Sequence, residues 1–350
     1  MTFDDLFVLE LACNHQGSLD RGTRIVQEFA RVVRINQVKA AIKLQFRSDD
    51  FVHKDWRTRC DVRYIKRCYE TRMAKEKYRR LVDEIRSNGC IPAATPFDEA
   101  SVDFCEELDL PFIKLASSDV NDWFLVERIA QTRRPVIAST GGSSERDVDD
   151  LVHFFGHRGI TLALNHCVSV YPSEPEELSL NHIDYLRVRY PGITLGFSSH
   201  EFRDWRASML ISYAKGVRTW ERHIDLGHGG KAPYCSTPDR IDEWFKAYHT
   251  AVEYCGSVGR RIPPAKEVKY LDALVRGVYA KRDLPAGYVL DHATVWDDLY
   301  LAVPLQRGQM SCRELFTGER LARSIVTDAP LMVSNVEGCI APQAAERGVE

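Results

Sequence analysis

The sequence has no apolar run long enough to cross a membrane and no overall excess of basic residues. Its 350 residues carry 47 Lys and Arg against 50 Asp and Glu, a formal net charge of -3. Nearly balanced charge gives no general attraction to nucleic acid or to an anionic membrane surface, so we expect neither as a partner. We interpret the one basic segment, RYIKRCYETRMAKEKYRR at 63–80, as solvated faces of helices. The first residues, MTFDDLFVLE, lack the basic start of a signal peptide, and we expect a cytoplasmic protein.

Paired cysteine motifs are absent as well. The chain has 10 cysteines, but none form a C-x-x-C pair with the spacing of a structural metal site. Cys13, Cys105 and Cys167 lie inside apolar segments, where a thiol behaves as a small hydrophobic side chain. We therefore expect free thiols in a reducing compartment, with a redox switch as the minor alternative.

What the sequence does contain is a recurring pattern of short apolar runs, each ending in polar residues that can take part in chemistry. Each run has the length of a β-strand and is rich in β-branched or aromatic residues. Amphipathic segments typical of helices separate the runs, for example at 20–33, 77–88, 101–109 and 204–216. The runs are residues 7–15, 40–46, 89–97, 112–119, 135–142, 160–167, 193–200 and 219–224.

Eight strands that alternate with helices predict an α/β fold, the (β/α)8 or TIM barrel. In this fold the active site lies at the carboxyl ends of the strands, where the scattered polar residues would converge. We predict the barrel domain over residues 1–255, because the pattern ends with a last helical segment near 256. A basic linker with two prolines follows at 256–272, then a small mostly-β domain at 273–336 and an irregular tail at 337–350.

Two histidines end neighbouring strands of the predicted barrel. His200 closes the seventh run and His223 nearly closes the eighth, so both imidazoles should reach the same rim. Such a pair suits a divalent metal that keeps positions open for water and substrate. A single barrel histidine is more often a hydrogen-bonded core residue, and this alternative stays open. Glu221 shares the alternation parity of His223, so both should point into the barrel.

Two lysines, Lys43 and Lys114, lie inside apolar strands. Burying an ammonium group is costly without an anionic partner, so two of them on separate strands indicate a shared anion at the barrel centre. The alternative is that each pairs with an internal carboxylate such as Glu10. Gln45 alternates inward together with Lys43. Hydroxyls and backbone N–H groups near other strand ends could wrap a phosphate, namely those of Ser117, Ser139, Thr140, Gly141, Gly142 and Ser198.

In this order, the segments that carry these residues resemble the motifs of the sialic acid synthase family. The segments are ELACNHQGS, AIKLQF, ATPFDEASVDF, FIKLASSD, PVIASTGG, LNHCVSVYPSEPEELSLNHI, LGFSSH and WERHI. The region from VYAKRDLPAGYVL to GERLARSIVTDAPL resembles that family's antifreeze-like (SAF) domain. The resemblance implies a metal-dependent condensation of phosphoenolpyruvate with an aldose, which gives a 3-deoxy-2-keto sugar acid and phosphate.

The resemblance also implies roles for individual residues. His200 and His223 match the metal ligands, with manganese expected and magnesium or cobalt as alternatives. The expected catalytic residues are Glu10, Glu221 and His223. Phosphoenolpyruvate would contact Lys43, Thr95, Lys114, Ser117, Ser139 and Ser198. The sugar would contact Gln45, Phe97, Tyr171 and Glu221.

Two segments depart from the family pattern, both on the side of the sugar. Where the family carries Gly-Pro-Asp-His or Gly-Pro-Asp-Ser after the eighth strand, this chain reads DLGHGGKAPYCSTPD, and Asp225 and His228 are candidate replacements for the acid. Where the antifreeze-like domain has an Arg-Pro-Gly turn, this chain reads AVPLQRGQM, with Pro304 at the arginine position and Arg307 further on. We hypothesise an acceptor other than N-acetylmannosamine.

The resemblance further implies a domain-swapped homodimer, in which the small domain covers the barrel of the partner and Arg307 contacts the substrate there. Two alternatives to the condensation remain. One is a metal-dependent barrel isomerase or lyase that uses the same histidines without phosphoenolpyruvate. The other is a catalytically inactive homologue that binds phosphoenolpyruvate without turnover.

Overall fold

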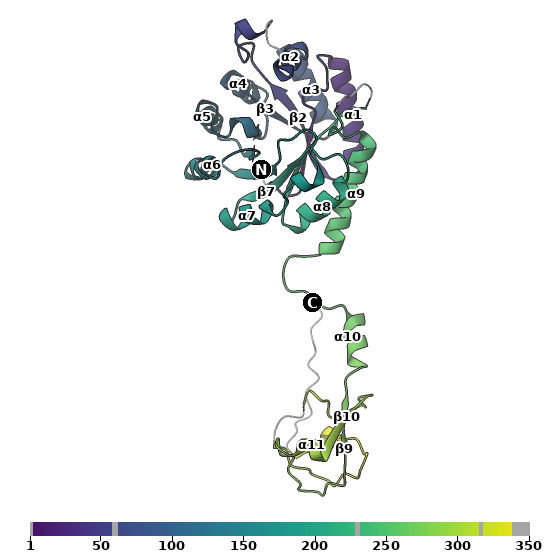
Figure 1. Ribbon diagram of the computed structural model, residues 1–350. Helices are drawn as coiled ribbons and strands as arrows, with labels where there is room; N and C mark the ends of the chain where they lie inside the picture. The colour runs from purple at the N-terminus through teal and green to yellow at the C-terminus, as the bar shows by residue number, and fades with distance from the viewer. Residues whose placement is uncertain (1–2, 58–61, 228–231, 315–317, 338–350) are drawn as a thin grey trace. The chain divides into compact units, whose positions relative to one another are not determined.

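The chain divides into two compact units, Met1–Gly256 and Ser257–Glu350, each of which has its own core. Figure 1 shows the computed structural model, which describes residues 3–57, 62–227, 232–314 and 318–337. Within these residues no helix is long and apolar enough to cross a membrane.

The first unit is a closed barrel of eight parallel strands, which confirms the (β/α)8 prediction. The strands follow one another around the barrel in sequence order, and the first pairs with both the second and the eighth to close the ring. They are β1 (Leu6–Glu10), β2 (Lys39–Phe46), β3 (Ile91–Pro96), β4 (Ile113–Leu115), β5 (Val136–Ser139), β6 (Leu162–Cys167), β7 (Thr194–Ser199) and β8 (Thr219–His223).

Helices lie around the outside of this barrel (Figure 1). Several begin where a side chain accepts a hydrogen bond from the first turn, as Ser18, Asp98 and Ser144 do. The α-helices are α1 (Leu19–Asn36), α2 (Arg63–Glu70), α3 (Lys75–Ser87), α4 (Glu99–Glu107), α5 (Trp123–Gln131), α6 (Glu145–His157), α7 (His182–Arg189), α8 (Trp205–Ala214) and α9 (Pro238–Cys255). Short 3-10 helices are η1 (Lys54–Trp56), η2 (Ser117–Asp119) and η3 (Pro175–Glu177).

Alternation along the strands separates two apolar layers. Outward residues pack under the helices, including Phe7, Leu9, Ile42, Leu44, Val136, Leu164 and Trp220. A second cluster fills the lower interior of the barrel and includes Leu6, Val8, Ala41, Ala93, Phe112, Ile137 and Ala163. Two residues further along each of these strands, at the same parity, come Glu10, Lys43, Thr95, Lys114, Ser139 and Asn165. The barrel is therefore apolar at its floor and polar toward the carboxyl ends of its strands.

A small residue in β7 makes room for a polar contact across the barrel interior. Asn165 and Thr219 pair in register with Gly196 from its two sides, and the Thr219 hydroxyl donates a 2.8 Å hydrogen bond to the Asn165 amide oxygen. A Cβ atom at Gly196 would overlap both groups. Glycine is required here because a side chain would break the contact between the neighbouring strands.

The second unit contains one two-stranded antiparallel sheet, β9 (Gly277–Ala280) and β10 (Leu299–Ala302). Its other elements are α10 (Ala265–Asp272), α11 (Val295–Asp298) and the 3-10 helix η4 (Val333–Asn335). Its core is a separate cluster that includes Val278, Leu284, Leu299, Met310, Leu321 and Leu331. Helix α10 lies inside the range 256–272, for which the sequence suggested an irregular linker because of its Pro-Pro pair.

Replacing Gly196 with alanine is expected to lower the free energy of unfolding by about 1–3 kcal/mol, because Asn165 or Thr219 must move. The matched control is Gly156→Ala, since Gly156 is exposed in α6 and nothing lies within 4 Å of the added Cβ. The control should be neutral or stabilise by up to about 1 kcal/mol. Chemical denaturation of both variants measures the difference, and equal effects would show that position 196 tolerates a side chain.

Candidate active site

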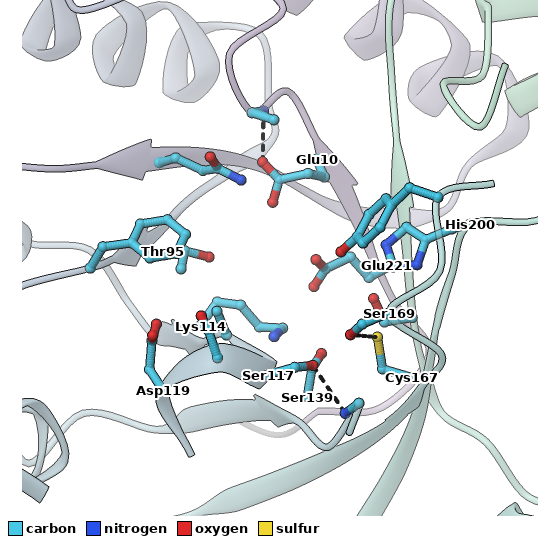
Figure 2. A pocket seen from close by; sticks show the side chains of 18 of the residues that line it. Glu10, Thr95, Lys114, Ser117, Asp119, Ser139, Cys167, Ser169, His200 and Glu221 are labelled. Atoms are coloured by element: carbon cyan, nitrogen blue, oxygen red, sulfur yellow. Dashed lines mark hydrogen bonds between the residues drawn. The ribbon is translucent and has the colours of Figure 1, made fainter. Parts of the chain in front are cut away.

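A cavity of about 810 Å³ opens at the carboxyl ends of the barrel strands. Figure 2 shows Glu10, Lys114, Ser139 and Glu221 directed into one open space from different strands. Thr140 and Asp225 do not line this cavity, but most of the barrel residues that the sequence marked as site residues do. Those that line it include Glu10, Lys43, Gln45, Thr95, Phe97, Lys114, Ser117, Ser139, Tyr171, Ser198, His200, Glu221 and His223.

A buried charge network occupies the first, second and eighth strands. Strand register places Glu10 beside both Lys43 and His223. The Lys43 ammonium group forms an ion pair with Glu10, donates a 2.8 Å hydrogen bond to the Thr95 hydroxyl and lies 3.4 Å from Oε1 of Glu221. Lys43 therefore has internal carboxylate partners, which is one of the two alternatives that the sequence left open.

Burial and neighbouring charges shift the ionisation of this network. Burial, with the nearby Lys114 ammonium group, lowers the pKa of Lys43 to about 8, although Glu221 opposes the shift. Burial alone would raise the pKa of Glu221, but the ammonium groups of Lys43 and Lys114 outweigh it and hold the pKa below its usual value. Near neutral pH Lys43 and Glu221 therefore both carry their charge.

Lys114 differs from Lys43 in its partners. Its ammonium group donates a 2.7 Å hydrogen bond to the Leu115 carbonyl, and no carboxylate of the described residues lies within ion-pairing distance. Nearby, the Ser139 hydroxyl is buried without a hydrogen-bond partner among the described residues. The Gly141 N–H donates a 3.0 Å hydrogen bond to the Ser117 hydroxyl. A buried cation beside hydrogen-bonding groups of strand ends is suited to an anion such as a phosphate.

The two histidines lie together at the opposite side of the cavity. The ring centroids of His200 and His223 are 5.3 Å apart, and the rings of Tyr171 and Tyr234 pack against them. Burial lowers the pKa of His200, and burial together with His200 and Lys43 lowers the pKa of His223 well below its usual value. Both imidazoles are therefore neutral near pH 7, which is the form that ligates metals.

The surroundings of His200 fit a metal ligand. Its Nδ1 lies 2.9 Å from the Val168 carbonyl, so we assign the proton to Nδ1 and the free electron pair to Nε2. A ligating histidine usually donates its other ring N–H to a carbonyl in this way. Within the described ranges no group of three His, Cys, Asp or Glu residues is placed to hold a metal. The protein would thus supply two imidazole ligands, and water or substrate would occupy the remaining coordination positions of the metal.

A buried ion pair behind the histidines was not anticipated from the sequence. Arg222 and Glu201 are both almost completely buried, and Nη1 of Arg222 lies 2.8 Å from Oε1 of Glu201. Arg222 also donates hydrogen bonds to the hydroxyls of Ser199 and Ser236. These contacts tie the end of β7 to β8 and to the segment that follows it, next to His200 and His223. The ion pair could have been suspected from Arg222, a charged residue in the apolar run TWERHI directly before His223.

Helix α2 contributes Tyr64, Arg67 and Cys68 to the cavity wall, so the interpretation of 63–80 as solvated helix faces is wrong for these three residues. The guanidinium carbon of Arg47 lies 3.9 Å from the centre of the Phe97 ring, and its Nη2 donates to Gln45 Oε1 (3.0 Å) and to the Tyr64 hydroxyl (2.6 Å). The lining residues that the sequence did not single out include Tyr64, Arg67, Cys68, Asp119, Ser169 and Tyr234. A basic helix with this composition carries no signal for which face is buried.

Three further candidates for the sugar side are Asp225, His228 and Arg307. Asp225 does not line the cavity but forms a 2.6 Å ion pair with Arg21, so it does not take the place of the family's acid. His228 lies outside the described residues. Arg307 is exposed in a turn of the second unit, where Gly308 follows it with a φ of 79°.

The fold and the cavity define a (β/α)8-barrel protein whose strand ends combine buried cations, two neutral histidines and acidic residues. The chain belongs to the NeuB family, whose model matches residues 32–258. The resemblance to sialic acid synthases is thereby confirmed, while the antifreeze-like character of residues 273–336 stays a prediction.

Individual relatives are similar over most of the chain. An N-acetylneuraminate-9-phosphate synthase from Drosophila melanogaster is 29% identical over 306 residues, which cover 81% of this chain and 78% of that protein. A pseudaminic acid synthase from Campylobacter jejuni is 25% identical over 300 residues, covering 82% and 85%. A crystal structure of a Chromobacterium violaceum protein assigned as spore coat polysaccharide biosynthesis protein E has a TM-score of 0.90 and 34% identity, covering 95% and 99%.

Proposed function

We propose that the chain catalyses the metal-dependent condensation of phosphoenolpyruvate with an aldose, giving a 3-deoxy-2-keto sugar acid and phosphate. The observation that carries this proposal is the pairing, in one cavity, of two buried lysines with two neutral histidines. The relatives support the class of product, because N-acetylneuraminate phosphate and pseudaminic acid are both sugar acids of this kind.

Phosphoenolpyruvate would bind over the second to fifth strands and the end of β7. Lys114 has no carboxylate partner among the described residues, so an anionic substrate would supply the missing charge. Four hydroxyl groups line the same space, those of Thr95, Ser117, Ser139 and Ser198. The Ser139 hydroxyl has no hydrogen-bond partner among the described residues, so it could donate to the substrate. In this position the two ammonium groups would stabilise the negative charge that accumulates on departing phosphate.

The aldose would bind on the side of His200 and His223, with Gln45, Phe97 and Tyr171 around it. A divalent ion held by the two histidines, manganese or alternatively magnesium or cobalt, would polarise the aldehyde oxygen as a Lewis acid. C3 of the enolpyruvate then bonds to the aldehyde carbon, water adds at C2, and phosphate leaves from the tetrahedral carbon. Glu10 and Glu221 reach this space from β1 and β8 and would orient the attacking groups and accept protons.

Arg307 is the one residue of the second unit to which we assign a role in substrate binding. We propose that the chain works as a domain-swapped homodimer in which Arg307 of one protomer contacts the sugar bound by the other. Its support is the resemblance, together with the exposure of Arg307 in its turn. The acceptor is proposed to differ from N-acetylmannosamine, because no acid among the described residues that follow β8 lines the cavity, and Asp225 is paired with Arg21 instead.

Phosphate release tests the proposed reaction. We expect release to require phosphoenolpyruvate, an aldehyde and a divalent metal together, to stop with EDTA and to return with manganese. Lys114→Met should lower kcat/KM for phosphoenolpyruvate by about 10²-fold or more. The control Lys246→Met removes an exposed ion pair with Asp242 on α9 and should leave kcat/KM unchanged.

The alternatives predict other outcomes of the same assay. An isomerase or lyase would release no phosphate, and an inactive homologue would bind phosphoenolpyruvate without turnover. A panel of aldoses and simpler aldehydes tests the acceptor hypothesis. A strong preference for N-acetylmannosamine would contradict it.

The pKa of Lys43 predicts the alkaline limit of activity. Lys43 is charged below about pH 8 and loses its proton above it, so kcat/KM for phosphoenolpyruvate should fall as pH rises through about 8. The groups that face Lys43 are Glu10, Glu221, Lys114 and Arg47. A profile of kcat/KM against pH measures this limit. A flat profile up to pH 10 would show that Lys43 keeps its proton or is not needed for binding.

A further inference from the structure

Two cysteines line the same wall of the cavity and are both partly exposed. Cys13 follows β1 in the loop that leads to α1, and Cys68 belongs to α2. Gln45, the neighbour of Cys13, accepts a 3.0 Å hydrogen bond from Arg47, and Arg47 also donates to the hydroxyl of Tyr64, which lies one helical turn before Cys68 on α2. Since a peroxide or a thiol reagent could reach them through the cavity mouth, they differ from the buried cysteines of the core.

The surroundings of this pair are electropositive. Sγ of Cys13 lies 3.9 Å from Oε1 of Gln45, and the guanidinium groups of Arg47 and Arg67 are close enough to stabilise a thiolate. The Cys68 thiol, the Thr71 hydroxyl and the positive charges of Arg47 and Arg67 lower the pKa of Cys13 although burial opposes the shift. The influence of Cys13 and burial raise the pKa of Cys68, so Cys13 is the thiolate and Cys68 the thiol of the pair.

The other cysteines show how unusual Cys13 is. Burial raises the pKa of Cys90 and of Cys235 to about 11, and it also raises the pKa of Cys105. The pKa of Cys13 is shifted in the opposite direction to the pKa values of these three cysteines. A thiolate is the nucleophilic form of cysteine, and oxidation selects accessible thiolates that have a second thiol beside them.

We propose that Cys13 and Cys68 form an oxidation site that takes hydrogen peroxide or a related hydroperoxide and closes to an intramolecular disulfide. The Cys13 thiolate attacks one peroxide oxygen and breaks the O–O bond, which gives a sulfenic acid and, after protonation, one water. The Cys68 sulfur then attacks the Cys13 sulfur, the S–S bond forms, and the hydroxyl leaves as a second water. Two thiols supply two electrons, and the peroxide is reduced to water.

The disulfide would change the sugar side of the cavity more than the phosphoenolpyruvate side. It would tie the loop after β1 to α2 and take Cys13 away from Gln45, which the proposed function assigns to the sugar. Lys114, Ser117 and Ser139 lie on β4, η2 and β5, and among the described residues they form no hydrogen bond or ion pair with the two cysteines. This consequence rests on the proposed function, whereas the oxidation itself does not.

The oxidation is tested on the full chain without any substrate. After treatment with a small excess of hydrogen peroxide, peptide mapping by mass spectrometry should find one disulfide that joins Cys13 to Cys68 and that dithiothreitol removes. Cys68→Ser should leave a sulfenic acid at Cys13, which dimedone labels. Cys13→Ser should slow the peroxide reaction of the remaining thiols by about tenfold or more. Cys255→Ser, which removes an exposed thiol at the end of α9, is the control and should form the Cys13–Cys68 disulfide as before.

Several results would overturn the proposal. They are a disulfide to any cysteine other than this pair, loss of the cross-link in Cys255→Ser, and absence of dimedone labelling at Cys13 in Cys68→Ser. Once turnover is established, oxidised protein should show a raised acceptor KM with a smaller change in the phosphoenolpyruvate KM, and dithiothreitol should restore both. If the disulfide forms but no phosphate is released by either state, the proposed function fails and the oxidation site stands.

Discussion

The structure depends on the burial of two ammonium groups at the centre of a barrel. Lys43 and Lys114 are both about 3% exposed or less, and only Lys43 has carboxylate partners among the described residues. An ammonium group removed from water requires compensating negative charge. Glu10 and Glu221 supply it for Lys43, while the Lys114 ammonium group donates to the backbone carbonyl of Leu115. The difference between the two lysines is the physical basis for proposing an anionic substrate.

The rest of the barrel holds these groups in place. Below them the interior is closed by small and branched apolar residues, and Gly196 leaves space for the hydrogen bond between Asn165 and Thr219. Beside them the ion pair of Arg222 and Glu201 fixes the strand ends that carry the histidines. Both features lie outside the cavity. They act on the site through backbone position, which determines where His200 and His223 stand.

Much of the fold could be predicted from the sequence because strand alternation has a period of two. The parity of Glu221 and His223, and of Lys43 and Gln45, was sufficient to place these side chains on one side, and all four line the cavity. The contribution of α2 could not be predicted, since a basic amphipathic helix shows no preference for a cavity wall over solvent. The pairing of Asp225 with Arg21 could not be predicted either, because it depends on how the start of α1 lies against the segment after β8, which is distant in sequence. Long-range pairs of charged residues have no periodic signal.

A crystal structure of the full chain with phosphoenolpyruvate and manganese bound is the decisive measurement for the proposed site. We expect the substrate phosphate or carboxylate to contact the ammonium group of Lys114. We also expect a manganese peak in the anomalous map about 2 Å from a ring nitrogen of both His200 and His223. Phosphoenolpyruvate bound away from Lys43 and Lys114, or manganese held without the two histidines, would contradict the proposed site.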